Sequence, residues 1–167
     1  MPGEFYFMAL GGLGVSLAGF AGLIAALDQR PEADSPIATW RIRNIVISGF
    51  TLTVAGFGVI AVHAVTGGNV TLTVRITSVF LAIGVALRMS VEMRPGPAWP
   101  SPLGRRFAVA TGFLYVVGYL ISAIRGGVGF LQLMLVFQLL DPLSIFFNTA
   151  RDVASGRITE PEDATRR

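Results

Sequence analysis

The chain has 167 residues, of which 53% are hydrophobic and only 14% are charged, and its mean hydropathy is +0.66. Soluble domains carry about 25% charged residues, and a soluble fold of this length cannot hide so much apolar surface, whereas a bilayer can. Cysteine is absent and histidine occurs once, at His63. Disulfides, cysteine-based metal centres and histidine-rich metal sites are therefore excluded, and no cofactor is expected.

Five apolar runs follow one another along the chain. They are Phe5–Leu27, Ile45–Val65, Val70–Leu87, Phe107–Ile124 and Val128–Ala150. Each is close to the roughly 20 residues that a helix needs to cross about 30 Å of hydrocarbon, and none alternates as a membrane strand does. The first run is too long for the core of a signal peptide and lacks a basic flank. We therefore predict an all-α integral membrane protein with five transmembrane helices, in a single membrane domain over residues 1–155.

The connections between the runs are of two kinds. Thr66–Val70 and Arg125–Gly129 are short and contain a Gly-Gly pair, which predicts tight turns between antiparallel helices. Asp28–Arg43 and Arg88–Arg106 are longer and charged, and prolines at positions 95, 97, 100 and 102 favour a stiff extended connector in the second. The chain is thus expected to form one helix followed by two Gly-Gly-linked helical hairpins.

The basic residues, all of them arginine, lie on one side of the predicted membrane except Arg75 and Arg125. The others occur in the two long connectors and after Ala150, and cytoplasmic segments are enriched in such residues. This predicts an N-terminus outside and a C-terminus in the cytoplasm, in a bacterial plasma membrane. The same placement argues against nucleic acid as a partner, despite the net charge of +3. Residues 156–167 are polar and are expected to form a disordered cytoplasmic tail.

A stripe of small residues marks one face of the first predicted helix. Gly14, Ala18, Gly22 and Ala26 recur every four residues. Small residues at this spacing let two helix backbones approach closely in lipid. The stripe fits either packing against another helix of the same chain, which we favour, or a homo-oligomer interface.

The two predicted hairpins resemble each other in sequence. Arg43–Phe50 and Arg106–Phe113 both begin with arginine and end with Gly-Phe, and beyond the turns Val79–Gly84 aligns with Val136–Asp141. One interpretation is a parallel internal repeat. The other, which we favour, is chance resemblance between apolar helices built from a small alphabet.

Polar side chains at membrane depth are few, and ionisable ones there are costly and often functional. Counting about 1.5 Å per residue places them in two layers. The outer layer holds His63, Arg75 and Gln132, and the inner layer holds Arg88, Gln138 and Asp141. Arginines near the ends of a span snorkel, and glutamines commonly hydrogen-bond between helices. Structural roles are therefore expected for most of these residues.

Asp141 differs from the others because its side chain is too short to snorkel far. It must be paired, protonated or facing water, and Arg88 and Gln138 lie near its depth. The following Pro142 kinks a helix, and Asp-Pro also begins helices, with aspartate as the N-cap. We predict a fifth helix kinked at Asp141–Pro142, and we favour a structural role for the pair over an ion or ligand site.

The pattern of functional residues is sparse. A nucleotide-binding loop, a catalytic triad and a pair of membrane carboxylates are all absent from the sequence, so an enzyme is the least favoured class. The first hypothesis is a non-enzymatic accessory or homo-oligomeric membrane component, which predicts a co-purifying partner and an Asp141→Asn variant that keeps function. The second is a small transporter or channel with a polar site around Asp141, which predicts pH-dependent flux that Asp141→Asn abolishes.

Overall fold

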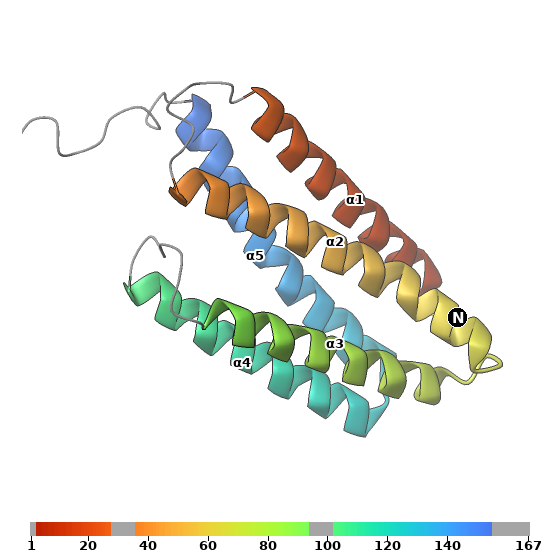
Figure 1. Ribbon diagram of the computed structural model, residues 1–167. Helices are drawn as coiled ribbons and strands as arrows, with labels where there is room; N and C mark the ends of the chain where they lie inside the picture. Colours follow the sequence, from red (N-terminus) through yellow and green to blue (C-terminus); the bar gives the residue numbers. More distant parts are fainter. Residues whose placement is uncertain (1–2, 28–35, 94–101, 155–167) are drawn as a thin grey trace, which may run out of the picture.

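Figure 1 shows the computed structural model of the chain, which describes residues 3–27, 36–93 and 102–154. Over these residues the chain forms five α-helices and no strand. They are α1 (Glu4–Leu27), α2 (Pro36–Val65), α3 (Val70–Glu92), α4 (Pro102–Arg125) and α5 (Val128–Ala154). Each is long and apolar enough to cross a membrane. The prediction of an all-α membrane protein with five spanning helices is confirmed for the described part of the chain.

Several helices extend beyond the apolar runs that predicted them. α2 begins at Pro36 and α3 continues to Glu92, so parts of both charged connectors are helical. Proline is favoured at the first position of a helix, where α2 and α4 both have one, because its missing N–H has no partner there. The apolar runs mark the part of each helix suited to hydrocarbon, and the helices continue into the polar interface. Residues 28–35 and 94–101, with Trp99 and three of the four connector prolines, and the predicted tail 156–167 lie outside the described residues.

Most described arginines lie at one end of the helices. This end, where α2 and α4 begin and α3 and α5 finish, carries Arg41, Arg43, Arg88, Arg105, Arg106 and Arg151. We call it the arginine-rich end, and we call the opposite end, where the short turns lie, the glycine-turn end.

Glycines with positive φ form the two short turns. Gly67 and Gly68 have φ values of 61° and 83°, and Gly126 has a φ of 66°. This conformation costs glycine little and other residues more. Asn69 then caps α3, because its side chain accepts a hydrogen bond from the Leu72 N–H at 3.0 Å. The tight turns predicted from the two Gly-Gly pairs are present.

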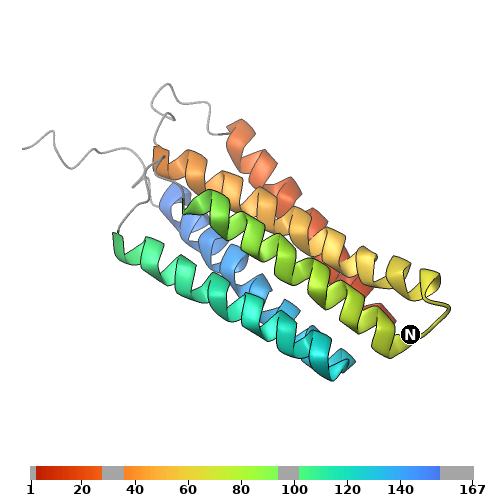
Figure 2. The ribbon, with the colours of Figure 1, turned by 60° about the horizontal axis from the view of Figure 1, so that its bottom comes forward.

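The helices pack as two close pairs with α5 between them (Figures 1 and 2). α1 lies along α2 and α3 lies along α4, so the closest pairs are those joined by the long connectors. α5 packs against α2, α3 and α4, and in both views α3 and α5 separate α2 from α4. Figure 1 shows α2 and α3 joined at the glycine-turn end and farther apart at the arginine-rich end.

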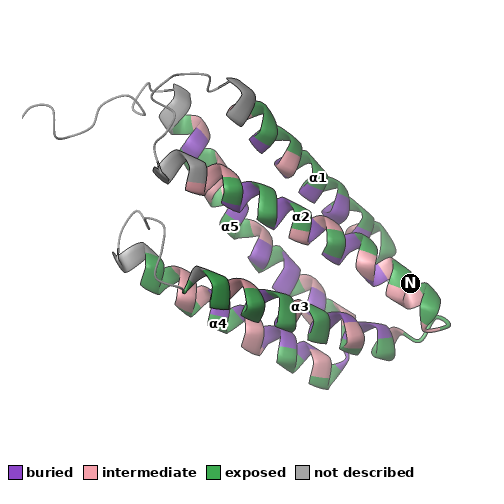
Figure 3. Cartoon of the chain, in the orientation of Figure 1, coloured by how far each residue is buried: buried purple, intermediate pink, exposed green. Residues whose placement is uncertain are grey.

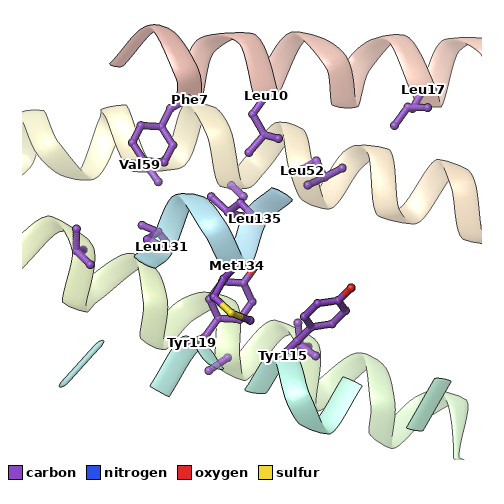
Figure 4. Packing of buried hydrophobic residues seen from close by; sticks show 14 of the residues in the cluster. Phe7, Leu10, Leu17, Leu52, Val59, Tyr115, Tyr119, Leu131, Met134 and Leu135 are labelled. Carbon is purple, nitrogen blue, oxygen red and sulfur yellow. The ribbon is translucent and has the colours of Figure 1, made fainter. Parts of the chain in front are cut away.

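The buried core is apolar and follows the contact between the helix pairs and α5 (Figure 4). Its fully buried members include Phe7, Ile45, Leu52, Val59, Val74, Tyr119, Leu131 and Leu135. Figure 4 shows Leu131 and Leu135 of α5 between side chains from α1 and α2 on one side and the tyrosines of α4 on the other. The α5 helix therefore joins the two pairs into one core.

The outer surface of the protein is also apolar. Only 28–39% of each membrane-spanning window is buried inside the protein, and large side chains such as Phe5, Val65 and Ile124 are more than three-quarters exposed. Figure 3 shows exposed residues along all the helices. A helix that is apolar on every side needs an apolar solvent as well as a core. The chain is therefore an α-helical integral membrane protein.

Glycines bring the backbones of α1 and α2 into direct contact. A Cβ atom at Gly14 would lie 2.5 Å from the carbonyl oxygen of Gly49, and one at Gly56 would lie 2.5 Å from that of Phe7. Neither position has room for any other residue without movement of the backbone. The Thr53 hydroxyl adds an interhelical hydrogen bond to the carbonyl of Gly11, at 3.3 Å.

The predicted stripe of small residues is divided by this packing. Gly14 and Ala18 lie against Gly49 of α2, inside the monomer. Gly22 is exposed and has open space around it, and the side chain of Ala26 lies outside the described part of the structure. A homo-oligomer interface at the Gly22 end of the stripe stays a prediction.

Candidate functional site

A cavity of about 630 Å³ lies between α2, α3, α4 and α5 toward the arginine-rich end. Pockets that bind small molecules typically measure about 300–1,000 Å³. Its walls are mainly apolar and include the aromatic side chains of Trp40, Phe50, Phe80 and Phe107. Polar side chains reach it from every helix around it, namely Asn44, Ser48, Thr51, Arg88, Thr111, Tyr115, Gln138, Asp141 and Ser144. The three residues predicted as an inner polar layer, Arg88, Gln138 and Asp141, thus all line one cavity.

Arg88 reaches from α3 to α2. Its Nη1 atom donates to Ser48 Oγ at 3.0 Å, and its Nη2 atom donates to Asn44 Oδ1 at 2.6 Å. Asn44 and Ser48 are four residues apart and therefore neighbours on one face of α2. The Asn44 amide nitrogen donates to the carbonyl of Trp40 at 2.9 Å, which turns its oxygen toward the guanidinium. The two neutral side chains orient Arg88 and hold it on the α2 side of the cavity.

Asp141 is held from α4. The Tyr115 hydroxyl lies 2.9 Å from Asp141 Oδ2 and 2.9 Å from the carbonyl oxygen of Phe137, so its one proton serves both acceptors. Tyr115 itself is buried, while Asp141 is exposed at the cavity wall. Arg88 and Asp141 are thus attached to different helices, one to α2 and the other to α4.

The Asp141–Pro142 pair lies inside α5, which runs from Val128 to Ala154 without a break. Asp141 therefore caps no separate helix, and its carboxylate bonds Tyr115 instead. Pro142 is fully buried, and the carbonyl of Gln138, four residues earlier, has no proline N–H to accept. The two residues have separate environments, since the proline packs into the protein and the aspartate faces the cavity.

Gln138 is tied more tightly into the protein than Asp141. Its side chain is buried, and its Oε1 atom accepts a hydrogen bond from the hydroxyl of Tyr119, which has no exposed surface. Figure 4 shows Tyr115 and Tyr119 on neighbouring turns of α4. The bond between Tyr119 and Gln138 joins α4 to α5 beside the cavity, which is the structural role expected for a membrane glutamine.

The predicted outer layer is dispersed over three places. His63 Nδ1 lies 3.2 Å from the Thr73 hydroxyl, which is 2.8 Å from that of Thr66, so these side chains join α2 to α3 at their turn. The backbone carbonyl of Gln132 accepts a hydrogen bond from the Tyr6 hydroxyl of α1 at 2.9 Å, and the side chain of Gln132 lies beside Gly3. Arg75 is exposed near the turn between α4 and α5. The structure does not bring these residues together into one site.

Three residues of the cavity wall were not predicted from the sequence, namely Asn44, Ser48 and Tyr115, and neither was the bond of Tyr119 to Gln138 beside it. Two pairs at a spacing of four, Asn44 with Ser48 and Tyr115 with Tyr119, place polar atoms on one face of α2 and of α4. Gln138 and Asp141, three residues apart, do the same on α5. The spacing of three or four residues between polar side chains was the available signal, because it places both members of each pair on one face of a helix.

The fold defines the protein as an α-helical membrane protein, with a partly open cavity among four of its helices that polar side chains reach. Comparison with protein-family models, with curated protein sequences and with solved structures finds no match to this chain.

Proposed function

We propose that this protein is a small non-enzymatic transporter that binds a small molecule in the cavity between α2 and α4. The supporting observation is that one cavity collects the charged side chains of Arg88 and Asp141 together with their anchors on α2 and α4. Charged groups at membrane depth are costly, and they commonly mark pathways of substrates or ions. The exposure of Asp141 at the cavity wall favours a binding role over the structural role that we expected from its sequence context.

The packing of the helices favours movement of one part against another. α1 with α2 and α3 with α4 form two tightly packed pairs, whereas contact between the pairs is less extensive and runs largely through α5. Transporters commonly expose a central site to each side in turn by rocking one such group of helices against another. The cavity lies where the two pairs meet.

The orientation forms part of the proposal. We infer that the arginine-rich end faces the cytoplasm of a bacterial cell and that the N-terminus lies outside. The described helices support this orientation because the glycine-turn end carries only Arg75 and Arg125 among their arginines. The excess of arginine at the other end is the asymmetry that orients membrane proteins.

An accessory or homo-oligomeric role was the first hypothesis from the sequence. In the described residues, exposed apolar side chains are spread over α1 to α5, as contact with lipid requires, and do not single out one partner-binding face. The cavity supports the transporter more directly, so the accessory role becomes the competing outcome of the experiment.

The test is flux into liposomes containing the purified protein. Three radiolabelled pools serve as probes: neutral amino acids, monoamines such as ethanolamine, and monocarboxylates such as acetate. We expect uptake of one pool above protein-free liposomes, and at least a tenfold loss in Asp141→Asn and Arg88→Gln, while Arg75→Gln outside the cavity keeps it. Absence of uptake for all three pools, together with a membrane protein that co-purifies equally with wild type and Asp141→Asn, contradicts transport and favours the accessory role.

A further inference from the structure

The two charged side chains of the cavity are hydrogen-bonded to different helices, and the charge of Arg88 is near enough to act on Asp141. Arg88 is bonded to Ser48 and Asn44 of α2, and Asp141 is bonded to Tyr115 of α4. α3 and α5, which carry the two charged residues, lie between α2 and α4 in both ribbon views (Figures 1 and 2). A ligand that bridges these two groups therefore meets a guanidinium at one end and a carboxylate at the other.

Both anchored groups are suited to a charged ligand. Ser48 and Asn44 carry no charge, so their contacts with Arg88 fix the plane of the guanidinium, whose planar fork matches carboxylate and phosphate groups. The Tyr115 hydroxyl contacts only Oδ2 of Asp141, among the contacts of the described residues, and the carboxylate has further acceptor sites for the N–H groups of an ammonium. Aromatic rings in the cavity wall add favourable contacts with a cation.

The remaining walls are suited to an apolar body. The cavity is lined by the aromatic side chains of Trp40, Phe50, Phe80 and Phe107. Gly84 of α3 also lines it, and the open space around this glycine makes the cavity wider there. A volume of about 630 Å³ is larger than two charged groups alone require. The lining therefore combines one positive side chain, one negative side chain and a mainly apolar remainder.

The geometry points to a zwitterionic ligand with an apolar body, bound with its carboxylate or phosphate at Arg88 and its ammonium at Asp141. This inference rests on the proposed function, because it names the class of ligand for the same cavity. A ligand with one charge contacts only one of these two side chains and forgoes the charge-assisted hydrogen bonds of the other. Two sources share the required chemistry: a free amino acid with an apolar side chain and the ethanolamine headgroup of a phospholipid.

The first test compares three molecules of nearly equal shape on the purified full-length protein. The probes are L-phenylalanine, 2-phenylethylamine, which lacks the carboxylate, and 3-phenylpropanoate, which lacks the amine. Isothermal titration calorimetry at neutral pH is expected to give at least tenfold tighter binding for phenylalanine than for either analogue. An analogue with one charge that binds as tightly as phenylalanine overturns the proposal.

Matched variants separate the two ends of the ligand. Arg88→Gln is expected to lose the preference for phenylalanine over phenylethylamine, and Asp141→Asn is expected to lose the preference over phenylpropanoate, each to within twofold. Arg75→Gln, outside the cavity, keeps both preferences. If either charged-residue variant fails to fold, Ser48→Ala and Tyr115→Phe replace them, since each removes an anchor and is expected to weaken the same preference. If all of these variants keep both preferences for phenylalanine, Arg88 does not bind the carboxylate and Asp141 does not bind the ammonium, and the assignment is overturned.

The second test distinguishes the lipid source from the free one. Native mass spectrometry is carried out on protein released from nanodiscs that contain equal amounts of phosphatidylethanolamine and phosphatidylglycerol. The headgroup is supported as the ligand if wild-type protein retains phosphatidylethanolamine selectively and does not bind phenylalanine. The Asp141→Asn variant is then expected to lose this selective retention. Equal or greater retention of phosphatidylglycerol with no binding of phenylalanine overturns the zwitterion, and so does the absence of both lipid retention and phenylalanine binding.

The outcomes also separate this inference from the proposed transport. Selective binding of a zwitterion without flux in liposomes supports the ligand class and contradicts the transporter. Flux of the amine or carboxylate pool alone supports the transporter and contradicts the ligand class.

Discussion

Glycine has opposite effects at the interface between α1 and α2 and at the cavity between α2 and α4. In the interface, Gly14, Gly49 and Gly56 remove side chains so that two backbones meet. At the cavity, Gly84 removes a side chain and leaves space that no other residue fills. In the interface the Thr53 hydroxyl bonds the carbonyl of Gly11 across the two backbones, whereas hydrogen-bonded polar side chains line the cavity.

This difference shows how the protein separates stability from function. α2 takes part in both regions, since one face packs on α1 and another presents Asn44 and Ser48 to Arg88. α1 and α2 pack more closely than any other pair of described helices, and the polar face of α2 is on its cavity side. Changes on the α1 side are therefore expected to cost stability, and changes on the cavity side are expected to alter ligand binding.

The largest expected effect is that of Gly14→Leu. A side chain at this position meets the backbone of α2 at 2.5 Å, so the helices must separate, and we expect a loss of about 3 kcal/mol or more in the free energy of unfolding. Thermal or denaturant unfolding in detergent measures it. Gly22→Leu on the same helix is the matched control and is expected to change stability by less than about 0.5 kcal/mol, because its surroundings are open.

The Gly22→Leu control also tests the predicted homo-oligomer. Blue-native electrophoresis of this variant gives the same assembly size as wild type if the stripe serves the monomer alone. A smaller assembly that still folds assigns the exposed end of the stripe to contact between copies of the chain.

Tyr119→Phe is expected to lower the free energy of unfolding by less than Gly14→Leu does. The change leaves Gln138 Oε1 buried without its hydroxyl donor, which costs about 1–2 kcal/mol of stability. Binding of phenylalanine is expected to stay within threefold of wild type. Tyr115→Phe is the matched comparison on the next turn, and it is expected to weaken binding more than stability because it frees Asp141. The assigned roles are contradicted if Tyr119→Phe mainly weakens phenylalanine binding and Tyr115→Phe mainly lowers stability.

Whereas Gly14→Leu is expected to lower the free energy of unfolding, Gly84→Ala is expected to raise it. A Cβ atom there meets nothing within 4 Å, and alanine is favoured over glycine in a helix by about 0.5–1 kcal/mol, so stability is expected to rise by up to that amount. Circular dichroism melting measures the change. Gly84→Phe is expected to fill the cavity wall and to weaken phenylalanine binding at least tenfold. A destabilised Gly84→Ala variant would show that α3 is packed there as tightly as α1 is on α2.

The smallest expected effect concerns Ser78 and Ser122, which share a buried hydrogen bond of 3.0 Å between α3 and α4. Polar pairs of this kind in membrane proteins couple by about 0.6 kcal/mol. A double-mutant cycle with alanine at both positions measures the coupling in the free energy of unfolding. A coupling several times larger would mean that the α3–α4 pair depends on polar contacts, unlike the α1–α2 pair.

The number of helices and the sites of the short turns could be predicted from the sequence, because both depend on local properties. A run of about 20 apolar residues has one stable form in lipid, and a Gly-Gly pair allows the positive φ found at Gly67 and Gly126. Counting along a helix also gives an approximate depth for each residue, and the three residues grouped in this way, Arg88, Gln138 and Asp141, line one cavity.

The partners of these residues could not be predicted in the same way. Whether Arg88 meets Asp141 or Asn44 depends on how each helix is rotated about its axis, and helices that are apolar on every side carry little information about rotation. The same reason explains the outer layer, where His63, Arg75 and Gln132 share a depth and face different neighbours. The bond of Tyr115 to Asp141 follows only from the packing of α4 on α5.

The most direct test of the account asks whether solvent and ligand reach the cavity. The chain contains no cysteine, so a single cysteine can be placed at Thr111 in the cavity wall or at Leu114, which lies outside the cavity on α4 and is 65% exposed. A membrane-impermeant thiol reagent applied to liposomes is expected to modify Thr111→Cys from the arginine-rich side, more slowly when phenylalanine is present, and to leave Leu114→Cys unmodified in lipid. An unreactive Thr111→Cys, or equal reaction at both positions, would contradict a ligand-binding cavity.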